Sequence, residues 1–154
     1  LYLRIRRLPF AAYADIAVPA IPLFHAFGRI GCFLGGCCYG IPWEGGITYT
    51  RALSPEANGV ARFPVQLLES ALLFALFFLL AALFRRGALR AKLLALYLAV
   101  YAVLRFLLEF LRGDAIRGVY FGLSTSQWIS LAILLALGGA ALARACASAS
   151  CAAS

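Results

Sequence analysis

The chain has 154 residues, of which 64% are hydrophobic and only 13% are charged. Soluble domains contain about 45–50% apolar and about 25% charged residues, so the composition excludes an ordinary soluble domain and leaves a soluble bundle of very apolar helices as a weak alternative. The net charge is +8, but the basic residues flank apolar runs instead of alternating with aromatic residues, which argues against a nucleic-acid partner.

Four apolar segments approach the length of about 20 residues that crosses a bilayer. They are residues 11–34, 65–84, 89–111 and 123–143. We therefore expect an all-α integral membrane protein with about four transmembrane helices, forming a single domain over residues 1–145. The small-residue segment 146–154 is expected to be a disordered tail.

Proline and loop residues divide this pattern. Pro19 and Pro22 interrupt the first apolar segment and predict a bent or broken helix. Inside a membrane protein, neighbouring groups can form hydrogen bonds with the backbone carbonyls that proline leaves without a partner. The loop 35–63 is unusually long, and loops of this length are typically functional or disordered. Its ITYT run, residues 47–50, could form a short strand.

The distribution of basic residues predicts the topology. Eight of them lie in short segments beside the apolar runs: Arg4, Arg6, Arg7, Arg85, Arg86, Arg90, Lys92 and Arg144. Cytoplasmic loops carry an excess of Lys and Arg, so we place the amino-terminal segment, the 85–92 loop and the C-terminus in the cytoplasm. The long loop 35–63 and the loop 112–122 are then extracytoplasmic.

The stretch from residue 23 to residue 40, LFHAFGRIGCFLGGCCYG, carries unusual polar groups for an apolar segment. His25, Arg29 and Cys32 step by four and three residues and so share one helical face. An arginine in such a segment is costly and usually serves a polar cavity or a substrate path. Gly31 and Gly35 are four residues apart and predict a face where another helix approaches closely.

Under the predicted topology, all four helices place polar groups in the outer half of the membrane. These groups are Arg29, Gln66, Glu69, Arg105, Glu109 and Gln127. Arg105 and Glu109 are spaced to pair along one helix, and Arg112 lies one turn further. An excess of guanidinium groups would suit a phosphate, so we expect a site for a phospholipid headgroup. The alternative is a set of polar contacts that only hold the helices together, with His25 as a helix-interface residue.

Four blocks of the chain resemble the prolipoprotein diacylglyceryl transferase family. They are residues 15–42 (DIAVPAIPLFHAFGRIGCFLGGCCYGIP), 62–70 (RFPVQLLES), 105–114 (RFLLEFLRGD) and 124–130 (STSQWIS). Each is similar to a motif of the family, and the four occur in the family's order. One block alone would be a weak signal, whereas the ordered set is specific.

The resemblance implies a transferase of the bacterial inner membrane that needs no metal and no cofactor. Such enzymes move the diacylglyceryl group of phosphatidylglycerol onto the lipobox cysteine of a preprolipoprotein. By the resemblance, Arg29 and Arg105 bind the phosphate, and Glu69 and Glu109 orient the arginines or polar headgroup atoms. The substrate-binding candidates are Gly28, Cys32, Gln66, Arg112 and Gln127.

The chain also departs from the family pattern. Cys32 stands where the family has asparagine, and a thiol cannot make the paired hydrogen bonds of an amide, so headgroup recognition is expected to differ. The family's His-Gly-Gly block lies upstream of the matched motifs, and His25 does not occupy its position. We expect this chain to correspond to the C-terminal portion of a family member.

Two other functions stay open on the residues alone. The first is a non-catalytic phospholipid-binding protein on the same scaffold. The second is a small membrane metal or redox protein that uses His25, Cys32, Cys37 and Cys38. Their spacing is irregular compared with the C-x2-C pairs usual in zinc sites, and a Cys32–Cys37 disulfide or simple apolar packing is also consistent with it.

Overall fold

The computed structural model describes residues 6, 10–114 and 118–152. Four of its helical segments are long and apolar enough to cross a membrane: Tyr13–Gly35, Val65–Arg85, Leu93–Leu111 and Thr125–Ser148. They agree with the four predicted spans to within a few residues, so the predicted all-α membrane fold class is confirmed. Arg4 and Arg7 of the predicted cytoplasmic segment lie outside the described residues.

The first span consists of two helices, as its prolines predict. Helix α2 covers Phe10–Ala17 and helix α3 covers Ala20–Gly35. The break falls at Val18 and Pro19, because proline has no backbone N–H to continue the helical ladder. Pro22 lies in the first turn of α3, where a missing N–H costs little.

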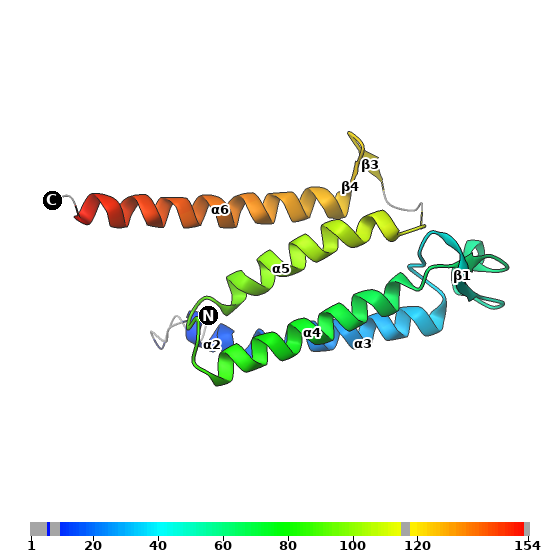
Figure 1. Ribbon diagram of the computed structural model, residues 1–154, viewed down its shortest axis with the longest axis horizontal. Helices are drawn as coiled ribbons and strands as arrows, with labels where there is room; N and C mark the ends of the chain where they lie inside the picture. Colours follow the sequence, from blue (N-terminus) through cyan, green and yellow to red (C-terminus); the bar gives the residue numbers. More distant parts are fainter. Residues whose placement is uncertain (1–5, 7–9, 115–117, 153–154) are drawn as a thin grey trace.

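Helices α4 and α5 pack with α2 and α3 into a unit of three apolar spans, the first of which consists of α2 and α3. Helix α4 spans Val65–Arg85, and helix α5 spans Leu93–Leu108 and continues as the short 3-10 helix η2, Glu109–Leu111. Helix α4 lies alongside α3, with α5 next to it (Figure 1). The apolar core lies near the α4–α5 connection and consists of Val18, Leu76, Leu80, Leu93 and Tyr97.

Helix α6, Thr125–Ala152, packs against α5 but has little buried surface. Only 6% of its apolar window is buried, compared with 28% for each of the other three spans, and it diverges from α5 toward its C-terminal end (Figure 1). The helix also continues through most of residues 146–154, for which the sequence suggested a disordered tail. This end is rich in alanine, which has the highest helix propensity.

Two small antiparallel sheets lie at one end of the helices. Strand β1, Pro42–Thr48, pairs with β2, Ala61–Arg62, and the 3-10 helix η1, Pro55–Ala57, lies between them. Strand β3, Val119–Tyr120, pairs with β4, Leu123–Ser124. The predicted strand in the ITYT run is confirmed for its first two residues, which end β1.

The predicted role of the glycines on α3 is wrong. A Cβ atom added at Gly31 would meet nothing within 4 Å, and one added at Gly35 would meet the Leu53 side chain at 3.0 Å. Leu53 belongs to the loop after β1, not to a helix. In the described part of the chain, α3 therefore does not use these glycines for close helix packing.

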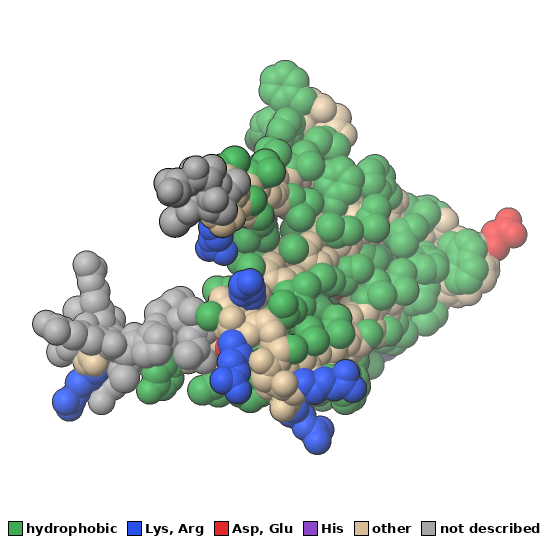
Figure 2. Space-filling view, turned by 60° about the vertical axis from the view of Figure 1, so that its left-hand side comes forward, with side chains coloured by type: hydrophobic (Ala, Val, Ile, Leu, Met, Phe, Trp, Pro, Cys, Tyr) green, Lys and Arg blue, Asp and Glu red, His purple; other side chains and the backbone are tan. Residues whose placement is uncertain are grey.

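The opposite end of the bundle is basic. Arg85, Arg86, Arg90 and Lys92 are exposed around the α4–α5 connection, and Figure 2 shows basic side chains gathered there beside a largely apolar surface. The α2 end and the C-terminal end of α6 lie at this same end (Figure 1). This arrangement is the one that the predicted topology requires.

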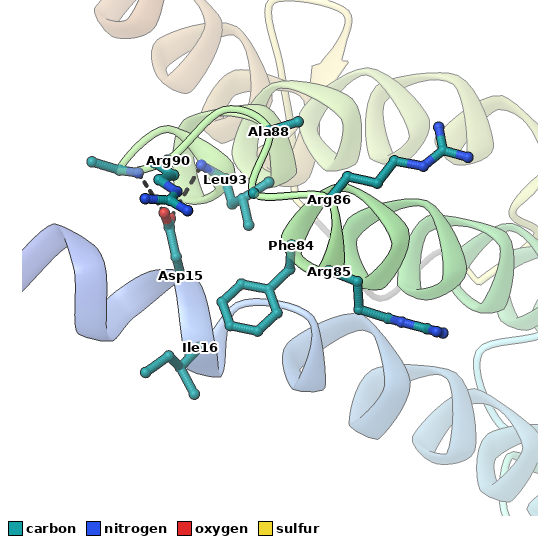
Figure 3. Close-up of a pocket in the computed structure, with 10 residues that line it drawn as sticks. Asp15, Ile16, Phe84, Arg85, Arg86, Ala88, Arg90 and Leu93 are labelled. Atoms are coloured by element: carbon teal, nitrogen blue, oxygen red, sulfur yellow. Dashed lines mark hydrogen bonds between the residues drawn. The ribbon is translucent and has the colours of Figure 1, made fainter.

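Asp15 is the buried carboxylate of the basic end. It accepts hydrogen bonds from the backbone N–H groups of Ala91 and Leu93, the latter at 3.2 Å, and so caps the start of α5. It lines a pocket of about 480 Å³, in which Arg85 and Arg86 point away from the carboxylate (Figure 3). The pocket is lined by the α4–α5 connection and α2 and contains none of the predicted site residues.

Candidate functional site at the loop end of the helices

The chain reverses sharply after α3 and brings two further cysteines back to the helix. Gly36 has a left-handed backbone with φ of 67°, and its N–H bonds to the carbonyls of Cys32 and Phe33. A Cβ atom here would lie 2.5 Å from the Cβ of Ala52, so only glycine fits. Cys37 N–H then donates to the Cys32 carbonyl at 3.1 Å, which closes the turn.

The next residues join three segments through backbone hydrogen bonds. Ile41 N–H donates to Leu111 O at 3.0 Å, Gly113 N–H to Tyr39 O at 3.0 Å, and Phe63 N–H to Ile41 O at 2.9 Å. A Cβ atom at Gly40 would lie 2.3 Å from the Phe63 carbonyl oxygen, so glycine permits this close approach. The ends of α3 and η2 and the start of α4 are thereby held together.

Helices α3 and α4 place a buried ion pair beneath this junction. Arg29 Nε lies 2.9 Å from Glu69 Oε2, and both side chains are at least nine-tenths buried. Ser70 Oγ donates to Ala26 O at 3.0 Å and Gln66 Nε2 to Cys37 O at 2.8 Å. These bonds fix both the helix pair and the loop above it.

The second ion pair lies on α5 and η2, and α6 adds a hydrogen-bond acceptor. Arg105 Nη2 lies 2.7 Å from Glu109 Oε2, which confirms the expected pairing along one helix face. The same nitrogen donates to Ser126 Oγ at 3.0 Å. Arg105 and Ser126 also line a pocket of about 170 Å³ between α5 and α6.

Arg112 follows the end of η2 and forms an ion pair with Asp114. Its Nε and Nη2 donate to the two carboxylate oxygens of Asp114 at 2.9 and 2.7 Å, a bidentate arrangement. A hydrogen bond also links it to the Cys38 thiol. Burial raises the Cys38 pKa. The hydrogen bond to Arg112 and the charges of Arg112 and Arg29 together outweigh this effect, so the Cys38 pKa lies below its usual value.

These contacts change the electrostatic argument for the site. We expected a surplus of guanidinium groups, whereas each of the three arginines just described contacts one carboxylate. The surplus is therefore not observed among them. One carboxylate does not saturate a guanidinium, which has five N–H donors. In the described part, Gln66 Oε1 and Glu69 Oε1 are buried and accept no hydrogen bond.

His25 lies at a helix interface beside this site. Its ring makes an edge contact with Tyr101 of α5 at 5.4 Å between centroids, and Nε2 lies 3.9 Å from Glu69 Oε1. Seven residues of helix separate it from Cys32, a rise of about 10.5 Å. It is not among the residues that the structure groups as potential metal ligands.

Two predicted substrate-binding residues have other surroundings. Gln127 Oε1 accepts from Ser124 N–H at 2.9 Å, and Gln127 N–H donates to Ser124 Oγ at 3.2 Å. This reciprocal capping box starts α6, and its S-x-x-Q signature was present in the sequence. Gly28 is exposed, and a Cβ atom there would meet nothing within 4 Å among described residues.

The structure brings together three thiols that sequence spacing did not group clearly. The sulfur atoms of Cys32, Cys37 and Cys38 all lie within 4.8 Å of one another. Burial, with a hydrogen bond to Cys32, raises the Cys37 pKa to about 11. Sequence reasoning also missed Ser126 and Asp114 as arginine partners, although both lie inside the motif blocks.

Comparison with known proteins gives matches to one family. The family described as prolipoprotein diacylglyceryl transferase matches residues 1–143. A phosphatidylglycerol–prolipoprotein diacylglyceryl transferase of Clostridium tetani is 40% identical over 76% of this chain and 47% of its own length. The corresponding figures are 41%, 79% and 48% for enzyme 2 of Clostridium perfringens, and 36%, 86% and 51% for the enzyme of Geobacter sulfurreducens.

The chain thus spans about half the length of the curated relatives that it matches. No solved structure gives a significant match. The family match covers far more than half of the chain, and the matched region includes Arg29, Glu69, Arg105 and Glu109. The chain therefore belongs to the prolipoprotein diacylglyceryl transferase family.

Proposed function

We propose that the protein takes part in transferring the diacylglyceryl group of phosphatidylglycerol to the lipobox cysteine thiol of a preprolipoprotein. The names of the relatives support the donor and the acceptor class. The observation that carries the proposal is the pair of buried arginine–glutamate contacts, Arg29–Glu69 and Arg105–Glu109, near the loop end of three neighbouring helices.

The reaction needs stabilisation of a departing phosphate. The thiolate attacks the glyceryl carbon, a C–S bond forms and the C–O bond to phosphate breaks. The phosphodiester, with one negative charge, becomes a glycerol phosphate monoester, whose additional charge or proton balances the proton lost by the thiol. Fixed cationic donors directed at that leaving group lower the barrier.

In the proposed site, Arg29 and Arg105 donate to the phosphate while Glu69 and Glu109 hold them in place. A guanidinium has five N–H donors and a planar fork, so it can bind a carboxylate and a phosphate at the same time. Gln66 Oε1 and Glu69 Oε1 are buried acceptors that suit the hydroxyl groups of a glycerol headgroup. Cys32, in the last turn of α3, and Arg112, directly after η2, lie at the edge of this site.

The pocket between α5 and α6 supports a lateral route for the lipid. Arg105 lines it together with apolar residues such as Ile129 and Ile133. A phospholipid entering between these helices would keep its acyl chains against apolar surface while its phosphate reached the arginine. The sparse burial of α6 is consistent with a helix that lipid contacts on most sides.

We further propose that the basic end faces the cytoplasm and the site faces outward across the bacterial inner membrane, with the C-terminus cytoplasmic. The exposed bases around the α4–α5 connection support this orientation. Cys146 is exposed near the C-terminal end of α6 and serves as a reporter. An impermeant maleimide should label it in inverted vesicles and not in intact spheroplasts; the reverse pattern would overturn the orientation.

Activity is tested with the full chain in membranes that contain phosphatidylglycerol labelled in its acyl chains. A lipobox peptide should acquire the label, and Arg105→Lys should reduce the rate at least about 100-fold, because lysine lacks the planar fork. Arg90→Lys, at the basic end, is the matched control and should retain the wild-type rate. Phospholipid binding without any transfer would instead favour the non-catalytic alternative.

A further inference from the structure

We propose that Cys32, Cys37 and Cys38 form a binding site for one thiophilic divalent metal ion of the zinc type. The metal site borders the lipid site proposed above, but its argument does not depend on the lipid chemistry. Irregular spacing in the sequence argued against such a site. The fold removes that objection, because the turn after α3 brings residues 37 and 38 back to the last turn of the helix.

The distances suit a small metal ion. Three sulfur atoms no more than 4.8 Å apart lie, in the limiting equilateral case, about 2.8 Å from a common centre, compared with about 2.3 Å for a zinc–sulfur bond. A shift of about half an ångström per sulfur therefore completes the coordination. Cysteine side-chain rotation can supply a movement of that size.

The surrounding backbone holds the three residues in place. Cys32 is in the last turn of α3, and its carbonyl accepts the N–H of Cys37 at 3.1 Å. Gln66 of α4 donates to the Cys37 carbonyl at 2.8 Å. Cys38 has φ of 54°, a left-handed conformation that is unusual for a residue with a Cβ and that recurs at functional sites.

The donor set determines the class of metal. Thiolates are soft ligands that favour zinc and similar ions over magnesium or calcium. Each coordinating thiol releases its proton to solvent on binding. Three protein ligands leave a fourth position for water or another small ligand, since the described residues grouped around these sulfurs include no fourth donor.

Such an ion would hold the turn at residues 36–38 against the end of α3. Cys38 is hydrogen-bonded to Arg112, so the metal site and the arginine share one loop junction. A metal bound here would therefore fix the position of this loop relative to the membrane-embedded ion pairs. The expected role is structural, with a measurable effect on protein stability.

The test uses the full chain purified in detergent under reducing conditions, stripped with a chelator and titrated with Zn²⁺ or Co²⁺. We expect one metal ion per chain, a Co²⁺–thiolate charge-transfer absorption and a raised melting temperature. Cys32→Ser, Cys37→Ser and Cys38→Ser should each weaken binding at least about tenfold. Cys146→Ser, in the exposed end of α6, should leave binding unchanged.

Either of two kinds of result would overturn the proposal, one from metal binding and one from the redox state of the thiols. The first is failure of the reduced wild-type protein to bind either metal, or equal binding by a variant with all three cysteines replaced by serine. The second is a Cys32–Cys37 disulfide, found by peptide mapping, in all of the protein isolated from intact membranes. Loss of lipid transfer with metal binding intact would count against the proposed enzymatic function alone.

Discussion

Arginines at the two ends of this helix bundle lie in opposite surroundings. Arg85, Arg86 and Arg90 are exposed around the α4–α5 connection, whereas Arg29 and Arg105 are buried against Glu69 and Glu109 near the loop end. Exposed charges set the sign of a surface and can be exchanged at little cost. Buried paired charges depend on their partners, because loss of one partner leaves the other uncompensated in an apolar interior.

Among substitutions at the two ends, Arg29→Ala is expected to cause the largest loss of stability. This change leaves the Glu69 carboxylate buried without its guanidinium, at a cost of about 3–5 kcal/mol in the free energy of unfolding. Thermal unfolding in detergent measures the loss. Replacing both partners, as Arg29→Met with Glu69→Leu, should restore most of the stability while transfer activity stays absent.

Arg85→Ala is the matched variant at the basic end, and its melting temperature should equal that of the wild type. A loss as large as that of Arg29→Ala would show that the two ends do not differ as described. Equal stability of Arg29→Ala and wild type would lead to the same conclusion from the other direction.

The loop junction provides the next test. At Gly40 an added methyl group would meet the Phe63 carbonyl oxygen at 2.3 Å, so Gly40→Ala should lower stability by about 1–3 kcal/mol. Gly138 of α6 has nothing within 4 Å of such a methyl group. Gly138→Ala should therefore be neutral or slightly stabilising, and equal melting temperatures for the two variants would contradict the tight junction.

At the basic end, we expect substitution of the buried acid Asp15 to lower stability. Asp15→Ala removes the carboxylate that caps α5 through Ala91 and Leu93, and should cost about 1 kcal/mol. Hydrogen exchange should increase at those two amides. Glu44→Ala, at an exposed position in β1, is the control and should leave the exchange rates unchanged.

The smallest effect is expected at the start of α6. Ser124→Ala and Gln127→Ala should each destabilise by about 0.5–1 kcal/mol, because both break the same capping box. The double variant should lose little more than either single variant, since the interactions are reciprocal. Additive losses would contradict the reciprocal capping box, and a large fall in transfer activity with stability intact would support a substrate-binding role for Gln127.

Much of the fold could be predicted because its causes are local. Apolar length predicted the spans, Pro19 predicted the break between α2 and α3, and the four-residue spacing predicted the Arg105–Glu109 contact. The prediction of close helix packing at Gly31 and Gly35 was wrong, because residue spacing shows that a helix face carries small residues but does not show which element packs on that face. The small residues at the end of α6 do not distinguish a disordered tail from a helix, because alanine also has a high helix propensity.

The candidate site was predictable only in part. Family motifs pointed to the arginines and glutamates, but not to which carboxylate contacts which guanidinium across helices. That pairing removed the expected surplus of positive charge. The thiol cluster was also hidden, because its members become neighbours through a left-handed turn at Gly36 that spacing alone does not reveal.

By itself the sequence determined that the protein is a helical membrane protein with a basic end and a polar, arginine-bearing end, since hydrophobic length and charge distribution act locally along the chain. The tertiary structure decided how Arg29 meets Glu69, how three backbones meet around Gly40, and how Cys32 gains two neighbouring thiols. These features depend on contacts between distant segments, and such contacts arise only when packing and backbone hydrogen bonds bring those segments together.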